Sequence, residues 1–177
     1  MIEQQVEEIG TLLDTLDRSG HPLNSEQFGQ VALGLAKVFS VDADEVAVLA
    51  VDAKRKILRF IIPEKLATIG TIPLTSTQAL AARTARERRA EVLNNFASAR
   101  HATVFEGVSL GRREGQCIHK MMSAPILEGT HAVGVVQISR KGESVRDAGP
   151  DFTQKDLRTL TSLAPSLLRF LKLCRAD

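Results

Sequence analysis

Two pairs of β-prone apolar runs, each joined by a short polar turn, constrain this chain more than any other feature. Residues 46–51 read Val-Ala-Val-Leu-Ala-Val and residues 57–62 read Ile-Leu-Arg-Phe-Ile-Ile. Residues 118–127 and 132–138 form a second pair around a turn at residues 128–130. Strand-like runs with so short a connection are typical of antiparallel hairpins. Hairpins in place of alternating strand–helix units predict an antiparallel sheet packed by helices.

The N-terminal region predicts two helices. Apolar residues in the first recur at spacings of four and three, which makes a short heptad seam on one helix face. Gly20 and Pro22 end this helix. Asn24 or Ser25 is expected to cap a second helix, whose apolar stripe faces a core. The first seam consists of Ile2, Val6, Ile9, Leu13 and Leu16.

The C-terminal region predicts another helix with a similar seam. Thr153 is expected to cap it, with Asp156 completing a capping box. Pro165 lies inside the helix and is expected to kink or interrupt it, because proline lacks the backbone donor. The seam consists of Leu157, Leu160, Ala164, Leu167, Leu171 and Cys174.

The middle of the chain predicts shorter elements. Residues 71–74 are extended, and Thr75-Ser76-Thr77-Gln78 reads as a capping box for a helix rich in Ala and Arg. Residues 91–93 predict a short strand, residues 97–105 a short helix, and residues 107–115 a loop. The predicted fold class is therefore α+β.

Composition narrows the classes of protein. The formal charge of +2 gives no strong attraction to nucleic acid, and no apolar run approaches the ~18 residues that span a bilayer. Cys117 and Cys174 are far apart in sequence and form no Cys-x-x-Cys motif, and the N-terminus lacks a signal-peptide pattern. These features predict a soluble, cytoplasmic protein with free thiols and without nucleic-acid or membrane partners.

The last hairpin and the helix after it resemble a GAF domain. The pattern is Ser123-Ala-Pro-Ile, a short turn, the strand at residues 133–138, a polar loop, and Phe152-Thr-x-x-Asp-Leu opening a helix. Gly134 in that strand would let a neighbouring element approach closely. Ile72-Pro-Leu and Val92-Leu-Asn-Asn agree more loosely. The resemblance covers residues 24–173. PAS domains share the general architecture and are the alternative family.

The resemblance implies a six-stranded antiparallel sheet with helices on both faces and the N- and C-terminal helices packed together. Residues 1–20 would form an N-terminal helix, and residues 24–173 a GAF-like domain that includes the C-terminal helix. In such domains the terminal helices often pair with a second copy, so the two seams predict a homodimer through them. The alternative is that each seam packs on the sheet and on the other within one chain.

The resemblance also implies a sensory or regulatory module in signal transduction, not an enzyme, that binds an unidentified small molecule and informs a separate output protein. No specific cofactor is indicated. A ligand-free dimerisation or protein-interaction module is the alternative. A redox enzyme similar to free methionine-sulfoxide reductases is disfavoured, because the chain lacks their glycine-flanked cysteine motif and Cys174 lies far from Cys117.

The family architecture places a pocket over the sheet, beneath residues 95–115. The alternative is that Phe96, Phe105 and Met122 fill this space as core, which would favour the ligand-free module. The candidate lining residues are Phe96, Arg100, His101, Phe105 and His119.

Three more specific chemistries are disfavoured. Cyclic-nucleotide binding is disfavoured because Leu157 replaces an acid of the family's motif and Arg140-Lys141 replaces its Asn-Lys pair. Covalent bilin attachment is disfavoured because Cys117 and His119 are separated by one residue. These two side chains share a strand face and are expected to contact each other. A metal site would need His101 as a further ligand and is not expected.

Overall fold

The computed structural model describes residues 1–19, 22–96 and 117–174. The short helix and the loop predicted for residues 97–115 lie outside this part of the chain. Among the described residues, no helix combines the length and the apolar character needed to cross a membrane.

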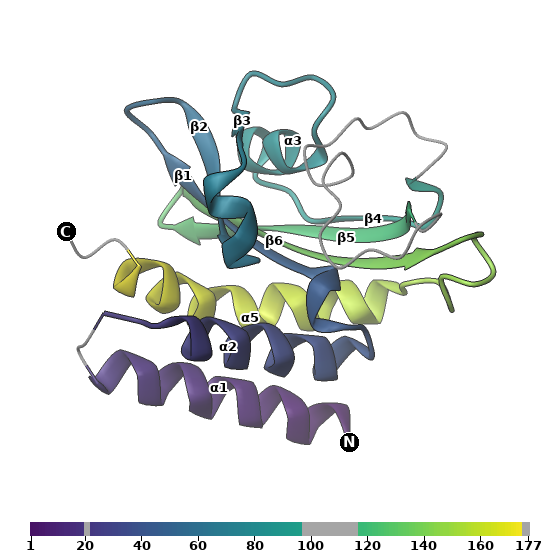
Figure 1. The fold of residues 1–177 in the computed structure, drawn as a ribbon, viewed down its shortest axis with the longest axis horizontal. Helices are drawn as coiled ribbons and strands as arrows, with labels where there is room; N and C mark the ends of the chain where they lie inside the picture. The colour runs from purple at the N-terminus through teal and green to yellow at the C-terminus, as the bar shows by residue number, and fades with distance from the viewer. Residues whose placement is uncertain (20–21, 97–116, 175–177) are drawn as a thin grey trace.

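The fold is a six-stranded antiparallel sheet with helices on both faces, as Figure 1 shows. The spatial strand order is β3-β2-β1-β6-β5-β4. The two predicted hairpins are β1–β2 and β5–β6, and β1 pairs with β6 in the centre of the sheet. The helices are α1 (Ile2–Ser19), α2 (Ser25–Phe39), α3 (Leu80–Glu87) and α5 (Gln154–Leu173), with short 3₁₀ turns η1 (Ala43–Glu45) and η2 (Glu64–Thr68). The strands are β1 (Val46–Asp52), β2 (Ile57–Ile62), β3 (Thr71–Pro73), β4 (Glu91–Leu93), β5 (Cys117–Glu128) and β6 (His131–Gly142).

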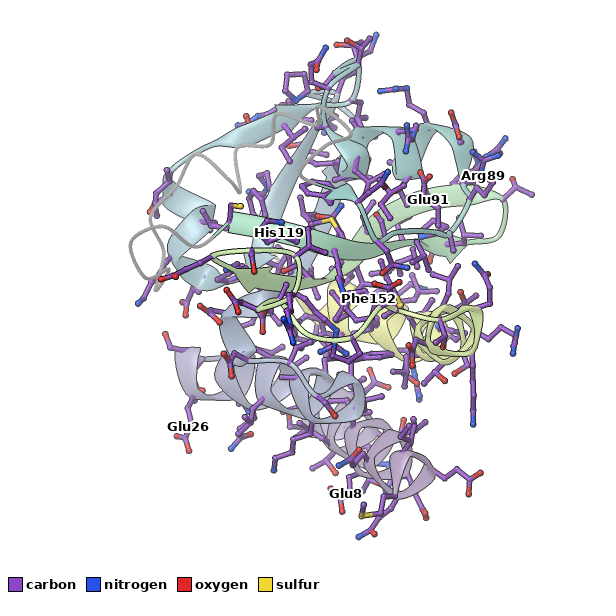
Figure 2. All side chains as sticks on the ribbon, turned by 90° about the vertical axis from the view of Figure 1, so that its right-hand side faces the viewer. Glu8, Glu26, Arg89, Glu91, His119 and Phe152 are labelled. Atoms are coloured by element: carbon purple, nitrogen blue, oxygen red, sulfur yellow. The ribbon has the colours of Figure 1, made fainter. Side chains whose placement is uncertain are left out.

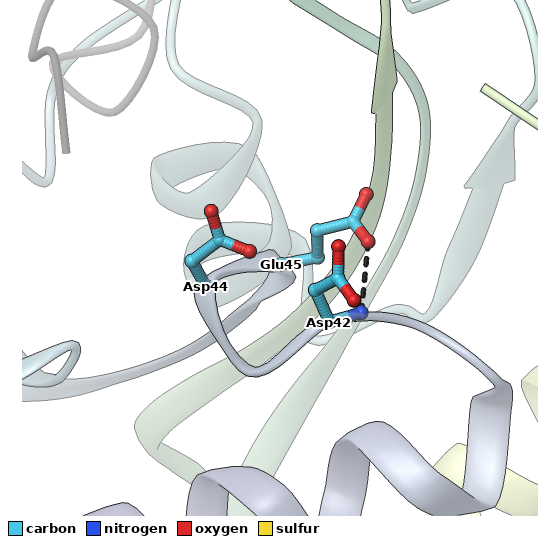
Figure 3. Close-up of side chains that lie close together, drawn as sticks. All are labelled: Asp42, Asp44 and Glu45. Atoms are coloured by element: carbon cyan, nitrogen blue, oxygen red, sulfur yellow. Dashed lines mark hydrogen bonds between the residues drawn. The ribbon is translucent and has the colours of Figure 1, made fainter. Parts of the chain in front are cut away.

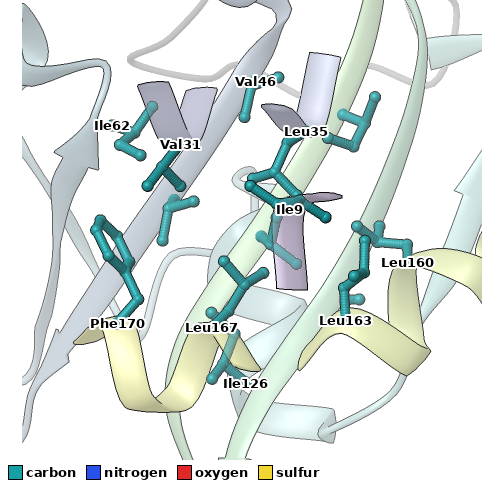
Figure 4. Packing of buried hydrophobic residues seen from close by; sticks show 14 of the residues in the cluster. Ile9, Val31, Leu35, Val46, Ile62, Ile126, Leu160, Leu163, Leu167 and Phe170 are labelled. Atoms are coloured by element: carbon teal, nitrogen blue, oxygen red, sulfur yellow. The ribbon is translucent and has the colours of Figure 1, made fainter. Parts of the chain in front are cut away.

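Three helices cover one face of the sheet, which we call the helix side. Helices α2 and α5 contact the strands, and α1 packs against α2 and α5 (Figure 1). Figure 4 shows the apolar core between them, in which Ile9, Leu35 and Leu167 converge. The polar faces of the helices point outward, as the positions of Glu8 and Glu26 in Figure 2 show.

Most side chains of both heptad seams are buried in this core. Ile9, Leu13 and Leu16 of α1 are buried within the chain, as are the five seam residues that precede Cys174 in α5. The terminal helices are therefore packed together, as predicted. Because these side chains are buried inside one copy, the seams no longer favour a dimer over intramolecular packing. The homodimer stays a prediction.

Gly134 of β6 permits the close approach expected of it. A Cβ atom added there would lie 2.6 Å from the carbonyl oxygen of Leu49 and even closer to Leu171 Cδ1. Strand β1 on one side and helix α5 above thus both occupy the space that a side chain would need. A glycine at this position lets α5 lie directly on the centre of the sheet.

The start of α5 also follows the prediction. Thr153 Oγ1 accepts a hydrogen bond from the Asp156 backbone N–H (3.1 Å), and Asp156 Oδ2 accepts one from the Thr153 N–H (2.8 Å). These two bonds form the predicted capping box. The side-chain amide of Asn94 bonds both backbone polar groups of Phe152, which fixes the entry of the chain into α5.

Two predicted features are wrong. Helix α5 continues through Pro165 without interruption, because Leu163, Leu167 and Phe170 on either side of it are buried and hold it against the sheet. Helix α3 begins only at Leu80, and no side chain caps it. Ser76 Oγ instead accepts from the Gln78 and Ala79 backbone N–H groups, so the expected capping box is a turn before the helix.

We expect Thr153→Ala to lower the free energy of unfolding by about 1 kcal/mol, because it leaves a helix N-terminal donor without its partner. Thr161→Ala is the matched control. Thr161 is exposed on the same helix and bonds back to the Leu157 carbonyl, so its replacement should change stability by less than about 0.5 kcal/mol. Urea denaturation measures both, and equal losses would contradict the capping role.

Candidate functional site

Strands β5 and β6 bury polar side chains on the face of the sheet that α3 covers, which we call the α3 side. Ser123, Gln137 and Ser139 are at most 5% exposed. The residues that alternate with them along the strands, such as Val136 and Ile138, belong to the helix-side core. Since side chains of a strand alternate between faces, the three polar residues face α3. The helix side of these strands also buries a polar residue, because Lys120 is 4% exposed and pairs with Arg140.

A chain of hydrogen bonds joins this row to α3. Gln137 Nε2 donates to Ser123 Oγ (3.1 Å), and Ser123 Oγ lies 2.7 Å from Thr84 Oγ1. Thr84 in turn donates to the Leu80 carbonyl (3.0 Å). Because the Thr84 proton is used on that carbonyl, Ser123 is the donor in the bond to Thr84. The chain therefore runs from Gln137 to α3 with every hydroxyl proton assigned.

The carboxamide oxygen of Gln137 is the open end of this chain. No residue in the described part of the molecule donates a hydrogen bond to Gln137 Oε1. An amide oxygen has two lone pairs that can accept hydrogen bonds. Gln137 is 5% exposed and pairs across the sheet with Ala47 and Ser123, among apolar residues of the α3-side core. It is thus an acceptor suited to a donor group from outside the described chain.

Ser139 and Glu45 hold the adjacent end of the row. Ser139 Oγ donates to the Glu45 carbonyl (3.3 Å). The Glu45 carboxylate accepts the backbone N–H groups of Asp42 (2.9 Å) and Lys141 (2.6 Å). Burial raises the pKa of Glu45, and these two hydrogen bonds oppose the rise. Through these hydrogen bonds, Glu45 therefore links the connection between α2 and β1 to strand β6.

Three carboxylates gather at this connection, as Figure 3 shows. One oxygen from each of Asp42, Asp44 and Glu45 lies within 4.8 Å of the others. Glu45 is occupied by the backbone bonds described above, and Asp44 Oδ2 lies 3.8 Å from Lys141 Nζ. Structural partners therefore account for two of the three acids.

Cys117 and His119 are in contact, as their spacing predicted. Cys117 Sγ lies 3.3 Å from His119 Nε2, and this nitrogen is 3.1 Å from the Gly142 carbonyl oxygen. A carbonyl can only accept, so Nε2 carries a proton. His119 lies where β5 slips in register between Ile118 and Lys120. In the neutral ring, Nδ1 is then a bare acceptor, and it is buried without a hydrogen-bond partner in the described chain.

The predicted pocket residues are only partly accounted for. Phe96 is 1% exposed and packs in the α3-side core beside Met121 and Phe60. His119 is buried on β5, as labelled in Figure 2. Arg100, His101 and Phe105 lie outside the described residues. The alternative in which Met122 fills the same space as Phe96 is wrong for Met122, because Met122 packs into the helix-side core on the opposite face of the sheet.

Sequence reasoning missed Thr84, Gln137 and Ser139 and treated Ser123 only as a small residue. A signal was present in β6, where Val135-Val136-Gln137-Ile138-Ser139 places a polar residue at every second position. Alternation of this kind predicts that one face of a strand is polar.

Arg140, which replaces an asparagine of the nucleotide-binding motif, has a structural role. Its guanidinium lies 4.6 Å from the centre of the Phe152 ring and donates to the carbonyls of Phe39 and Ser40. Figure 2 shows Phe152 where the sheet meets α5. Arg140 therefore ties the end of α2 to the start of α5.

The two cysteines lie at opposite ends of the sheet. Cys117 pairs with Gly142, whereas Cys174 adjoins Ala50 and Val51 of β1, at the level of Gly134. From Gly134 to Gly142 is roughly 25 Å along a strand at about 3.4 Å per residue. A disulfide requires Cα atoms within about 7 Å. Burial also raises the pKa of the Cys174 thiol to about 11, so it stays protonated at neutral pH.

Comparison with known proteins gives a consistent result for the fold. The sequence matches the GAF domain family over residues 25–167. No curated protein matches the sequence. Among solved structures, the fold is similar to the GAF domain from an Acinetobacter phosphoenolpyruvate-protein phosphotransferase, with a TM-score of 0.69 and 11% identity over 98% of this chain and 95% of that one.

Two further structures are similar to this chain. One is the free methionine-R-sulfoxide reductase from Neisseria meningitidis in complex with its substrate, with a TM-score of 0.66, 16% identity and coverage of 99% of this chain and 90% of that one. The other is a methyl-accepting chemotaxis protein, residues 122 to 287, with a TM-score of 0.66, 15% identity and coverage of 94% and 99%. At these identities the similarity concerns the fold alone.

Proposed function

Because the chain belongs to the GAF domain family, we propose that it is a sensory or regulatory module that binds a small molecule on the α3 side of its sheet. The observation that carries this proposal is the row of buried polar residues Ser123, Gln137 and Ser139 on that face. Burying a polar side chain costs free energy unless it gains a partner. Ser123 and Ser139 have partners within the chain, whereas Gln137 Oε1 receives no hydrogen bond from the described residues.

The proposed ligand is largely apolar and carries a hydrogen-bond donor such as a hydroxyl, amine or amide N–H. Gln137 Oε1 would accept this donor, and the apolar surroundings of Leu49, Phe60 and Val135 would exclude water. His119, with its bare Nδ1, is a second acceptor for a donor group of the ligand. The ligand's other contacts would come from the pocket residues predicted by the resemblance, Phe96, Arg100, His101 and Phe105.

Binding would inform a separate output protein through the terminal helices. The row lies on β5 and β6, and α5 packs on the other face of the same strands. A ligand that prefers one arrangement of these strands would shift the population of α5 positions. The resemblance implies homodimerisation through the terminal helices. In such a dimer, a partner protein could respond to the change in the position of α5.

A ligand-free interaction module is the second candidate. Phe96 favours it, because its ring is 1% exposed and fills part of the α3-side core as an ordinary apolar residue. A reductase is less well supported, although one similar structure is a reductase bound to its substrate. Turnover through two cysteines would require Cys117 and Cys174 to meet, and the strand geometry separates them by far more than a disulfide allows.

Thermal unfolding in the presence of fractionated small molecules from the source cells tests the proposal. At ten times its dissociation constant, a ligand adds about 1.4 kcal/mol and should raise the melting temperature of the wild type by about 3 to 5 °C. Gln137→Leu should abolish this rise, because it removes the acceptor and keeps the volume similar. Gln30→Leu, at an exposed position of α2, should respond as the wild type does. A fraction that stabilises both variants equally, or no active fraction at all, would count against this site.

A further inference from the structure

A cavity lies on the helix side of the sheet, between α2, η1 and the end of β2. Its volume is about 300 Å³. The apolar walls are formed by Phe28 and Ala32 of α2 and by Ile62 and Pro63 at the end of β2. Ligand pockets in proteins start at about this size. The cavity is therefore large enough for a small organic molecule.

Carboxylates dominate the charge around this cavity. Asp44 and Glu64 both line it, and Lys65 is the cation among the lining residues. Asp44 Oδ2 is 3.8 Å from Lys141 Nζ, which is a long and partly exposed contact. Glu64 Oε1 accepts a hydrogen bond from the Ser25 hydroxyl (3.1 Å), which is uncharged. Lys141 Nζ also donates to the Asp44 carbonyl (2.9 Å), so Asp44 already has a cation beside it. Glu64, whose partner is uncharged, keeps the capacity to accept a charge-assisted hydrogen bond.

The negative charge extends beyond the lining residues. Asp42 and Glu45 lie beside Asp44, with one oxygen of each of the three within 4.8 Å of the others (Figure 3). Like charges at this distance raise one another's free energy, and a cation placed near them is attracted. Four carboxylates (Asp42, Asp44, Glu45 and Glu64) lie near three cations (Lys65, Lys141 and Arg140), so the small excess of negative charge favours a cationic group.

We propose that this cavity binds a small molecule with an apolar body and a protonated amine. The apolar body would lie against Phe28, Ile62 and Pro63. The ammonium group would donate a hydrogen bond to Glu64. This site is separate from the one in the proposed function, because it uses residues of the helix-side core and the opposite face of the sheet.

A neighbouring hollow supports an extended binding surface. Its volume is about 290 Å³, and it shares Phe28 and Glu64 with the first cavity. The Phe28 ring is fixed by an edge-to-face contact with Phe170, with ring centres 5.9 Å apart. Glu64 therefore lies at the junction of two apolar spaces, where a single carboxylate can hold the amine of molecules of different length.

Three probes of similar shape and different charge test the proposal in the wild-type protein. We expect phenethylamine to bind at neutral pH about three- to tenfold more tightly than 2-phenylethanol, because partly exposed charge-assisted bonds contribute modestly. The anion 3-phenylpropionate should bind more weakly than the alcohol. Chemical-shift titration by NMR gives the dissociation constants. Glu64→Gln should remove most of the difference between the amine and the alcohol.

A glycine pair supplies a matched blocking variant and its control. Gly29 lines the cavity on α2, and a Cβ added there meets no atom within 4 Å. A Cβ added at Gly10 of α1 is equally free. Gly29→Met should therefore fold, fill the cavity and weaken phenethylamine binding at least tenfold, whereas Gly10→Met should bind as the wild type does.

The proposal is overturned if the three probes bind equally, or if Gly29→Met binds phenethylamine as tightly as Gly10→Met. Neither result would bear on the α3-side site, because Gln137 and the polar row take no part in this experiment. Conversely, loss of the thermal shift in Gln137→Leu should leave phenethylamine binding unchanged. The two proposals can thus fail separately.

Discussion

Phe170→Ala is expected to lower the free energy of unfolding by about 3 to 5 kcal/mol, one of the two largest losses expected of a single substitution here. The Phe170 ring is 1% exposed, lies in the helix-side core (Figure 4) and contacts the edge of Phe28. Truncation removes this apolar surface and leaves a cavity between α2 and α5 that the sheet prevents from closing. Urea denaturation followed by far-UV circular dichroism measures the loss.

Leu33→Ala is the control for this prediction. Leu33 is in α2 but is 49% exposed, so its truncation should cost less than about 1 kcal/mol. A loss below about 1.5 kcal/mol in Phe170→Ala would mean that α2 and α5 can close over the space. The description of a tightly packed helical layer would then be wrong.

Gly134→Ala is expected to cost about 2 to 4 kcal/mol, although it adds only one methyl group. The added Cβ would lie 2.6 Å from the Leu49 carbonyl oxygen, which belongs to the backbone of the neighbouring strand. It would also meet Leu171 Cδ1. Relieving both contacts requires β1 or α5 to shift, and overpacking of this kind is costly.

Gly10→Ala provides the opposite result in the same assay. A Cβ at Gly10 meets nothing within 4 Å, and alanine is favoured over glycine inside a helix by about 0.8 to 1 kcal/mol. This variant should therefore be slightly more stable than the wild type. If Gly134→Ala were equally well tolerated, the close approach of α5 to the sheet would not be a requirement of the fold.

Much of the fold was predictable because it depends on short-range chemistry. The β1–β2 hairpin follows from β-prone runs at residues 46–51 and 57–62 with a five-residue connection. The cap at Thr153 follows from a hydroxyl three residues before an acid. The contact between Cys117 and His119 follows from their spacing in a strand. In each case the structural feature is determined by residues that are close together in the sequence.

The failures have long-range causes. Thr84 and Ser123 are far apart in sequence, and only the packing of α3 on β5 joins their hydroxyl groups. Helix α5 tolerates Pro165 because buried residues on both sides compensate for the missing backbone bond. The start of α3 was mistaken because Ser76 bonds the backbone of a turn with the same geometry that it would use at a helix cap.

The candidate site shows the same division. Periodicity can assign Gln137 and Ser139 to one face of β6, but which face is covered by three helices depends on the assembled sheet. The resemblance to GAF domains led to the right family and the right sheet. It did not lead to the polar row, because the pattern that carries the resemblance does not say which side chains α3 covers.

The most direct test of the central claim is native mass spectrometry of the protein purified from its own source, before and after denaturation. We expect a mass excess of a few hundred daltons that disappears on denaturation, in line with a pocket that holds a small non-covalent ligand. The same preparation of Gln137→Leu should lack the excess. A wild-type protein that is entirely at the mass of the bare chain, with every small-molecule fraction inactive in thermal unfolding, would contradict the ligand-binding role.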